Sequence, residues 1–162
     1  MLHNGLRMLN PYEAFKKNYL VCGLAEDAMS EVWAMGLMET HLARDTLIKI
    51  NEKSSDLFVI LDGNVQVMTG DGDVLAEPGP GSVLGEMGLI DDRPRSAEVV
   101  CLGLTKVARI PAKELRSYMN SNRDVGFMIL ANLARVLCGR LRLADAKIDQ
   151  LSDGNDPWKD SL

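Results

Sequence analysis

A glutamate and an arginine nine residues apart mark the segment of this chain best suited to binding chemistry. Glu86 follows Gly85, and Arg95 stands alone at the head of an expected strand. Glycine lets the backbone turn and lets a ligand approach closely, and a helical turn after it leaves N–H groups free for an anion. A guanidinium suits two phosphate oxygens. A carboxylate beside an anion site is favourable only if it accepts a hydrogen bond from a ligand hydroxyl. The pattern therefore predicts a ligand with an anionic group, an alcohol and an apolar part.

The residues around this pair follow an order that is typical of one protein family. Gly-Glu-x-Gly-Leu-Ile at 85–90 and Pro-Arg-Ser-Ala-x-Val at 94–99 resemble the phosphate-binding cassette of the cyclic nucleotide-binding domain. That family includes the bacterial catabolite activator and the regulatory subunits of cyclic-AMP-dependent kinase. Residues 56–65 resemble its strand–glycine–strand segment, and 79–81 resemble the turn that leads to its pocket. The combination in this order and spacing is specific, and the resemblance extends over roughly residues 15–151.

The resemblance implies a cyclic nucleoside monophosphate, cAMP or cGMP, as ligand. Glu86 would accept the ribose 2′-hydroxyl, and Arg95 would pair with the cyclic phosphate. The other expected ligand-binding residues are cassette residues and the apolar wall beside them: Val83, Leu84, Gly85, Met87, Gly88 and Ser96. Base contacts should come from the C-terminal helix, where two alignments stay open. One places Ala144 and Asp145 at the base, and the other places Arg140 and Leu141 there.

A compact sheet structure is needed to position these residues. At 162 residues the chain is long enough for one domain with its own core. Between residues 46 and 110, short apolar runs alternate with turns such as Asp-Gly at 62–63 and 71–72. We expect an α+β fold, a β-sandwich jelly-roll barrel of about eight strands with short N-terminal helices and a long C-terminal helix. Within a single domain over 1–162, the expected parts are a helical lead-in (11–43), the jelly roll (44–110), C-terminal helices (111–151) and a flexible tail (152–162).

The expected C-terminal helix has apolar residues at alternating spacings of four and three, a pattern typical of a helix that packs along another helix. The spacing predicts a homodimer through Leu130, Leu137, Leu141 and Ile148. The alternative is a helix that lies on its own barrel. Gly126 and Gly139 fall within this helix, where each disfavours helix formation, so each predicts a bend or a close approach to the barrel.

Composition argues against several other functions. The 18 basic and 23 acidic residues give a net charge of −5, which disfavours a broad nucleic-acid surface. The three cysteines and two histidines show no spacing typical of metal ligands or of a catalytic group, so we expect neither a metal nor an enzyme. No stretch approaches the ~18 apolar residues of a membrane span, and we expect a cytoplasmic protein.

These observations predict a stand-alone regulatory sensor in which ligand repositions the C-terminal helix. The downstream effector would be a protein that the sequence does not identify. Only eleven residues follow Leu151, so we do not expect the DNA-binding domain of the activator branch. The alternative is a ligand-free jelly roll that acts as a structural or protein–protein interaction module.

Overall fold

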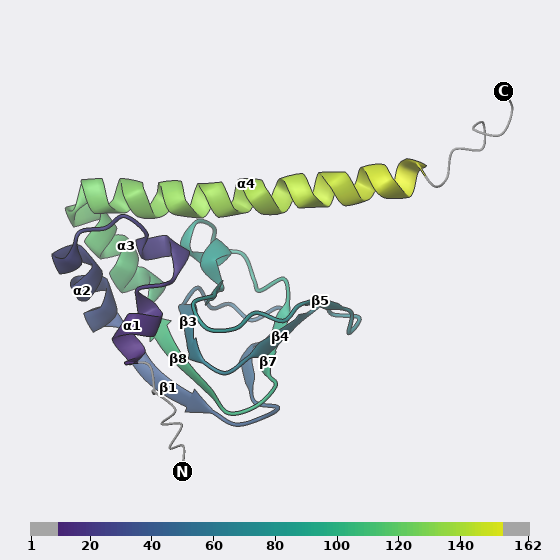
Figure 1. The fold of residues 1–162 in the computed structure, drawn as a ribbon, viewed down its shortest axis with the longest axis horizontal. Helices are drawn as coiled ribbons and strands as arrows, with labels where there is room; N and C mark the ends of the chain where they lie inside the picture. The colour runs from purple at the N-terminus through teal and green to yellow at the C-terminus, as the bar shows by residue number, and fades with distance from the viewer. Residues whose placement is uncertain (1–9, 154–162) are drawn as a thin grey trace, which may run out of the picture.

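Two four-stranded antiparallel sheets lie face to face, with the helices gathered at one end (Figure 1). The structure is a computed structural model that describes residues 10–153. One sheet has the strand order β1-β8-β3-β6 and the other β2-β7-β4-β5. The strands are β1 (Leu37–His41), β2 (Thr46–Ile48), β3 (Leu57–Asp62), β4 (Val65–Met68), β5 (Val74–Ala76), β6 (Val83–Leu84), β7 (Glu98–Cys101) and β8 (Thr105–Ile110). The expected jelly roll of about eight strands is confirmed.

Helices precede and follow the strands along the chain, and one short helix lies between β6 and β7. The α-helices are α1 (Pro11–Phe15), α2 (Glu26–Met35), α3 (Ala112–Ser121) and α4 (Arg123–Asp153), and the short 3-10 helices are η1 (Tyr19–Val21) and η2 (Glu86–Leu89). In Figure 1, α4 runs across the molecule above α3 and continues past the sheets. No helix within residues 10–153 has both the length and the apolar composition needed to cross a bilayer.

Two boundaries differ from the sequence-based prediction. The helical lead-in over 11–43 was extended too far, because residues 37–41 form β1, which pairs with β8 in continuous register from Leu37↔Arg109 to His41↔Thr105. The apolar residues after α2 continue its helical spacing, but pairing with the edge of an existing sheet overrides that local pattern. The C-terminal helix continues past residue 151 to Asp153, the last described residue, and the rest of the expected tail, 154–162, lies outside the described residues.

The core has two parts that meet at the first sheet. Between the sheets lie residues such as Ile60, Val65 and Val107, all fully buried. Between the first sheet and the helices lies a larger cluster that includes Ile129 and Leu133 of α4. The first half of α4 is therefore part of the domain core, whereas its residues from 141 to 151 are all exposed.

Gly126 and Gly139 have different surroundings, which separates the two interpretations of these glycines. A β-carbon at position 126 would lie 2.7 Å from the carbonyl oxygen of Met119, so α4 crosses α3 at a distance that only glycine permits. A β-carbon at position 139 would meet nothing within 4 Å. The close approach is thus real at Gly126, against α3 rather than the sheets, and absent at Gly139.

Alanine at these two positions should have opposite effects. Alanine favours a helix over glycine by about 1 kcal/mol. Gly139→Ala should therefore raise the free energy of unfolding by up to about that amount. Gly126→Ala should lower it, because the methyl group forces α3 and α4 apart. Urea denaturation followed by circular dichroism measures both, and equal stabilisation by the two substitutions would contradict the α3–α4 contact.

Candidate functional site

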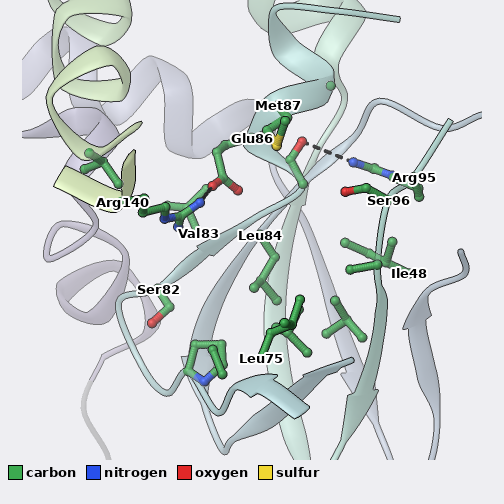
Figure 2. Close-up of a pocket in the computed structure, with 18 of the residues that line it drawn as sticks. Ile48, Leu75, Ser82, Val83, Leu84, Glu86, Met87, Arg95, Ser96 and Arg140 are labelled. Atoms are coloured by element: carbon green, nitrogen blue, oxygen red, sulfur yellow. Dashed lines mark hydrogen bonds and ion pairs between the residues drawn. The ribbon is translucent and has the colours of Figure 1, made fainter. Parts of the chain in front are cut away.

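A cavity of about 770 Å³ opens between the cassette, the inner faces of the strands and α4. Its lining includes all eight cassette and wall residues that the sequence predicts: Val83, Leu84, Gly85, Glu86, Met87, Gly88, Arg95 and Ser96. Figure 2 shows Glu86 at one end of the cavity and Arg95 with Ser96 at the other, with Leu84, Ile48 and Leu75 in the region between and below them. The cavity therefore has two separate polar ends joined by an apolar wall.

Gly85 permits the turn that joins β6 to η2. Its φ is 75°, in the left-handed region that disfavours residues with a β-carbon. A β-carbon here would lie 2.6 Å from Nη1 of Arg95 and 2.8 Å from the carbonyl oxygen of Asp56. Both the backbone conformation and the space therefore require glycine, and what approaches it closely in this structure is the arginine itself.

Arg95 points into the fold, and only 8% of its surface is exposed. Nη1 donates to the carbonyl oxygen of Gly85 at 3.1 Å, and Nη2 donates to that of Asp56 at 2.6 Å. Nε is buried and has no hydrogen-bond partner among the described residues. Burial lowers the pKa of Arg95 from its usual value, although Asp56, Glu52 and Glu86 oppose the shift. The guanidinium is thus a buried cation held by backbone oxygens.

The surroundings of Arg95 fix its position at both ends. Its backbone N–H donates to the carbonyl oxygen of Glu52, and its own carbonyl oxygen accepts from the backbone N–H of Asn51. These two bonds tie Arg95 to the turn after β2. The Asp56 carboxylate accepts from Nε of Arg109 at 2.9 Å and from the backbone N–H of Ala112 at 3.2 Å. The carbonyl that holds Arg95 therefore belongs to a residue that is itself anchored to β8 and to the start of α3.

Glu86 is buried at the opposite end and forms its ion pair with α4. Its side chain is 6% exposed and pairs with Arg140, whose side chain is 54% exposed. Among the described residues, Arg95 forms no ion pair with a carboxylate. The two key charges of the cassette are thus not neutralised by each other, and the acidic one is joined to the C-terminal helix (Figure 2).

Of the four candidate base contacts on α4, one lies at the cavity and three do not. Arg140 lines the cavity, together with Val136 one turn before it. Leu141, Ala144 and Asp145 are exposed and are not among the lining residues. Of the two alignments, only the one that includes Arg140 brings an α4 residue to the cavity.

Several lining residues were not predicted from the sequence. They come from the N-terminal helical part, from strands other than β6, and from α4, and include Lys17, Tyr19, Ile48, Val67, Leu75 and Val136. For Val67 the sequence itself gave a signal, because apolar and polar residues alternate in Val65-Gln66-Val67 and alternate residues of a strand face the same side. No local sequence pattern predicts Tyr19 as a site residue, because Tyr19 reaches the cavity only through the packing of η1 against α4. Burial raises the pKa of Tyr19 above its usual value, the charge of Glu86 adds to this, and Arg140 opposes it.

Within residues 10–153, no group of three or more histidine, cysteine or acidic side chains could hold a metal ion. The cavity lining offers the buried cation of Arg95, the buried carboxylate of Glu86, further charged side chains, hydroxyl groups and apolar contacts.

Known proteins resemble this chain in sequence and in structure. Glutaminase 1 of Bradyrhizobium diazoefficiens is 29% identical over 133 residues, which are 82% of this chain but only 22% of that enzyme. The cAMP-activated global transcriptional regulator of Escherichia coli is 30% identical over 140 residues, 82% of this chain and 65% of the regulator. The catabolite activator protein of Thermus thermophilus has a TM-score of 0.73 at 25% identity, over 83% of this chain and 63% of that protein.

The family model described as the cyclic nucleotide-binding domain matches residues 39–122, which is more than half of the chain. These residues run from β1 to the end of α3 and contain the whole cassette. The chain therefore belongs to the cyclic nucleotide-binding domain family.

Proposed function

We propose that the cavity binds one cyclic nucleoside monophosphate, with the phosphate at Arg95 and the ribose 2′-hydroxyl at Glu86. One observation supports this most directly: a buried cation and a buried carboxylate lie at separate ends of one cavity of about 770 Å³. A nucleotide has the matching arrangement of an anion, an alcohol and a flat, largely apolar base. The cAMP-activated relative makes cAMP the first ligand to test, with cGMP as the second.

At the phosphate end, the proposal uses donors that the protein itself leaves unused. Nε of Arg95 has no partner among the described residues. The first N–H groups of η2 also lack partners within that turn, and Ser96 lies beside Arg95 in Figure 2. A cyclic phosphate with one negative charge would supply the acceptor oxygens and the counter-charge together.

At the sugar end, ligand and helix would compete for the same carboxylate. Glu86 is 4% exposed and is already paired with Arg140 of α4. A ribose hydroxyl that donates to Glu86 would take part of the place of Arg140. Because ligand then favours one position of α4 over another, binding would reposition the helix. Arg140 is half exposed, so water screens its ion pair with Glu86. A weak competing hydrogen bond is therefore sufficient to displace Arg140.

The function proposed for this domain is that of a regulatory binding module rather than an enzyme. Among the described residues, neither histidine nor cysteine lines the cavity. The cavity wall also lacks a nucleophile placed against a general base, which acyl or phosphoryl transfer would require. Ligand binding alone explains the two polar ends of the cavity, and no reaction is needed. The function that fits is a stand-alone sensor that passes the ligand signal through α4.

The exposed half of α4 is the proposed contact with a second copy of the chain. Of the four residues predicted to form the homodimer contact, Leu137 packs against the domain's own core, whereas Leu130, Leu141 and Ile148 are 45%, 62% and 59% exposed. A helix of this length without tertiary contacts is marginal in water. A partner helix that covers Leu141 and Ile148 would stabilise it and would place two cavities on either side of one helix pair.

Arg95→Ala should weaken cAMP binding by about 2–5 kcal/mol, because a buried phosphate charge loses its partner. Arg95→Lys should restore little, since an ammonium cannot reproduce the planar fork. Isothermal titration calorimetry measures both. The matched control is Arg93→Ala, another arginine of the cavity wall whose side chain is 85% exposed and should contribute little. Unchanged affinity for a folded Arg95→Ala protein would remove Arg95 from the site, and absence of heat from the wild type at millimolar cAMP and cGMP would favour the ligand-free interaction module.

Arg140→Ala should shift α4 without ligand in the direction in which cAMP shifts it in the wild type. The change removes the ion pair that holds α4 at Glu86. The measurement is a distance by electron paramagnetic resonance between nitroxides at Cys138 and at Asp71→Cys, in a Cys22→Ser background because Cys22 is also exposed. Arg142→Ala is the control on the same exposed stretch. Identical distances with and without cAMP would contradict repositioning of the helix.

Leu141→Glu and Ile148→Glu should each convert the dimer to a monomer in sedimentation velocity. Buried like charges across a helix pair are strongly unfavourable. Leu143→Glu serves as the control, since Leu143 is at least as exposed, at 67%, but is not one of the four predicted contact residues. A wild-type protein that sediments as a monomer at all concentrations would rule out this contact.

A further inference from the structure

The hydroxyl of Tyr19 is a polar group in the cavity wall that the protein leaves without a partner. Tyr19 lines the cavity although it lies more than sixty residues before the cassette in sequence. Its hydroxyl oxygen is buried and has no hydrogen-bond partner among the described residues. A buried hydroxyl without a partner costs folding free energy, and in native proteins such groups usually have a partner in bound water or ligand.

The packing of η1 against α4 places Tyr19 at the sugar end of the cavity. η1 contacts α4, and Arg140 of α4 forms the ion pair with Glu86. Tyr19, Glu86 and Arg140 all line the cavity. The same two charges act on the pKa of Tyr19, which Glu86 raises and Arg140 lowers. The phenol therefore lies on the side of the cavity that carries the carboxylate for which we propose the ribose contact.

The segment that bears Tyr19 is held firmly on both sides. Asn18 is buried, donates to the carbonyl of Phe15 at 2.7 Å, and accepts from the backbone N–H of Leu20 at 3.0 Å. On the helix side, the buried Asn132 of α4 donates to the carbonyls of Leu20 and Cys22 at 3.0 and 2.8 Å. The phenol is thus pre-positioned, because little conformational freedom remains to be lost when a ligand binds.

An alcohol needs two kinds of partner, and the sugar end offers both. A hydroxyl group donates one hydrogen bond and accepts others. An ionised glutamate can only accept, so Glu86 by itself satisfies half of a ribose hydroxyl. A phenol O–H can donate to the oxygen of the same hydroxyl.

We propose that Tyr19 donates a hydrogen bond to the ribose 2′-hydroxyl while that hydroxyl donates to Glu86, so that Tyr19 helps to select a ribose over a deoxyribose. The inference rests on the proposed function and names a residue from the N-terminal helical part as a specificity determinant. Tyr19 lies beside α4 because Asn132 joins η1 to the buried first half of that helix.

Tyr19→Phe tests this assignment, because it removes only the hydroxyl. We expect cAMP binding about 3- to 10-fold weaker by calorimetry, the effect of one hydrogen bond. With 2′-deoxy-cAMP the same substitution should change the affinity less than 2-fold. Without ligand, the variant should melt at the same temperature as the wild type or higher, since a buried unsatisfied hydroxyl is removed. The control is Tyr12→Phe, whose hydroxyl donates to Glu26 at 2.7 Å outside the cavity and whose loss should leave both affinities unchanged.

The outcomes separate this inference from the proposed function. If the wild type binds neither cAMP nor cGMP, both are overturned. If the wild type binds cAMP and Tyr19→Phe binds it equally well, the role of Tyr19 alone is overturned. Equal weakening for cAMP and 2′-deoxy-cAMP would overturn the assignment to the 2′-hydroxyl. A lower melting temperature for unliganded Tyr19→Phe would show that the hydroxyl stabilises the fold, and would also overturn it.

Discussion

The burial of the Arg95 guanidinium against two backbone carbonyls is the constraint on which the rest of the site depends. A cation removed from water must be compensated, and a carboxylate partner is the usual solution. Here the oxygens of Gly85 and Asp56 provide dipoles instead of a full negative charge. The cation is therefore held in place but not neutralised, which favours an anionic ligand. The same arrangement explains why position 85 must be glycine, since a β-carbon there would overlap Arg95.

This constraint also explains why the position of Glu86 matters. Had the buried glutamate paired with Arg95, a phosphate would have to break an internal ion pair before binding. Glu86 instead pairs with Arg140 of α4, which leaves the Arg95 guanidinium without a carboxylate partner among the described residues and available for the proposed phosphate. The cassette is joined to the helical layer a second time, where Arg116 of α3 donates to the carbonyl oxygen of Gly88 at 2.8 Å. Both ends of η2 are thus in contact with helices that follow the sheets in sequence.

The sequence predicted the site residues best where they lie close together along the chain. All eight expected cassette and wall residues line the cavity, because a turn and its two flanking strands fix their relative positions locally. It was least informative where distant elements meet. The two alignments of α4 could not be separated without knowing how far along its length the helix docks, which depends on the Gly126–Met119 contact and on the burial of Leu133. Tyr19 and β1 were missed for the same reason, since packing rather than local pattern determines their roles.

The position of Arg140 within α4 connects the cavity to the exposed part of the helix. Residues before it, such as Leu133, are in the core, and every residue from 141 to 151 is exposed. Arg140 is therefore the last residue of α4 that lines the cavity. Figure 1 shows α4 continuing past the sheets. Successive residues of a helix differ in direction by about 100°, so Leu141 presents a different side from its neighbour. From Arg140 onward α4 is exposed, so the proposed shift at Arg140 would carry the exposed apolar residues with it. The cavity and the proposed partner surface are consequently connected by one helix.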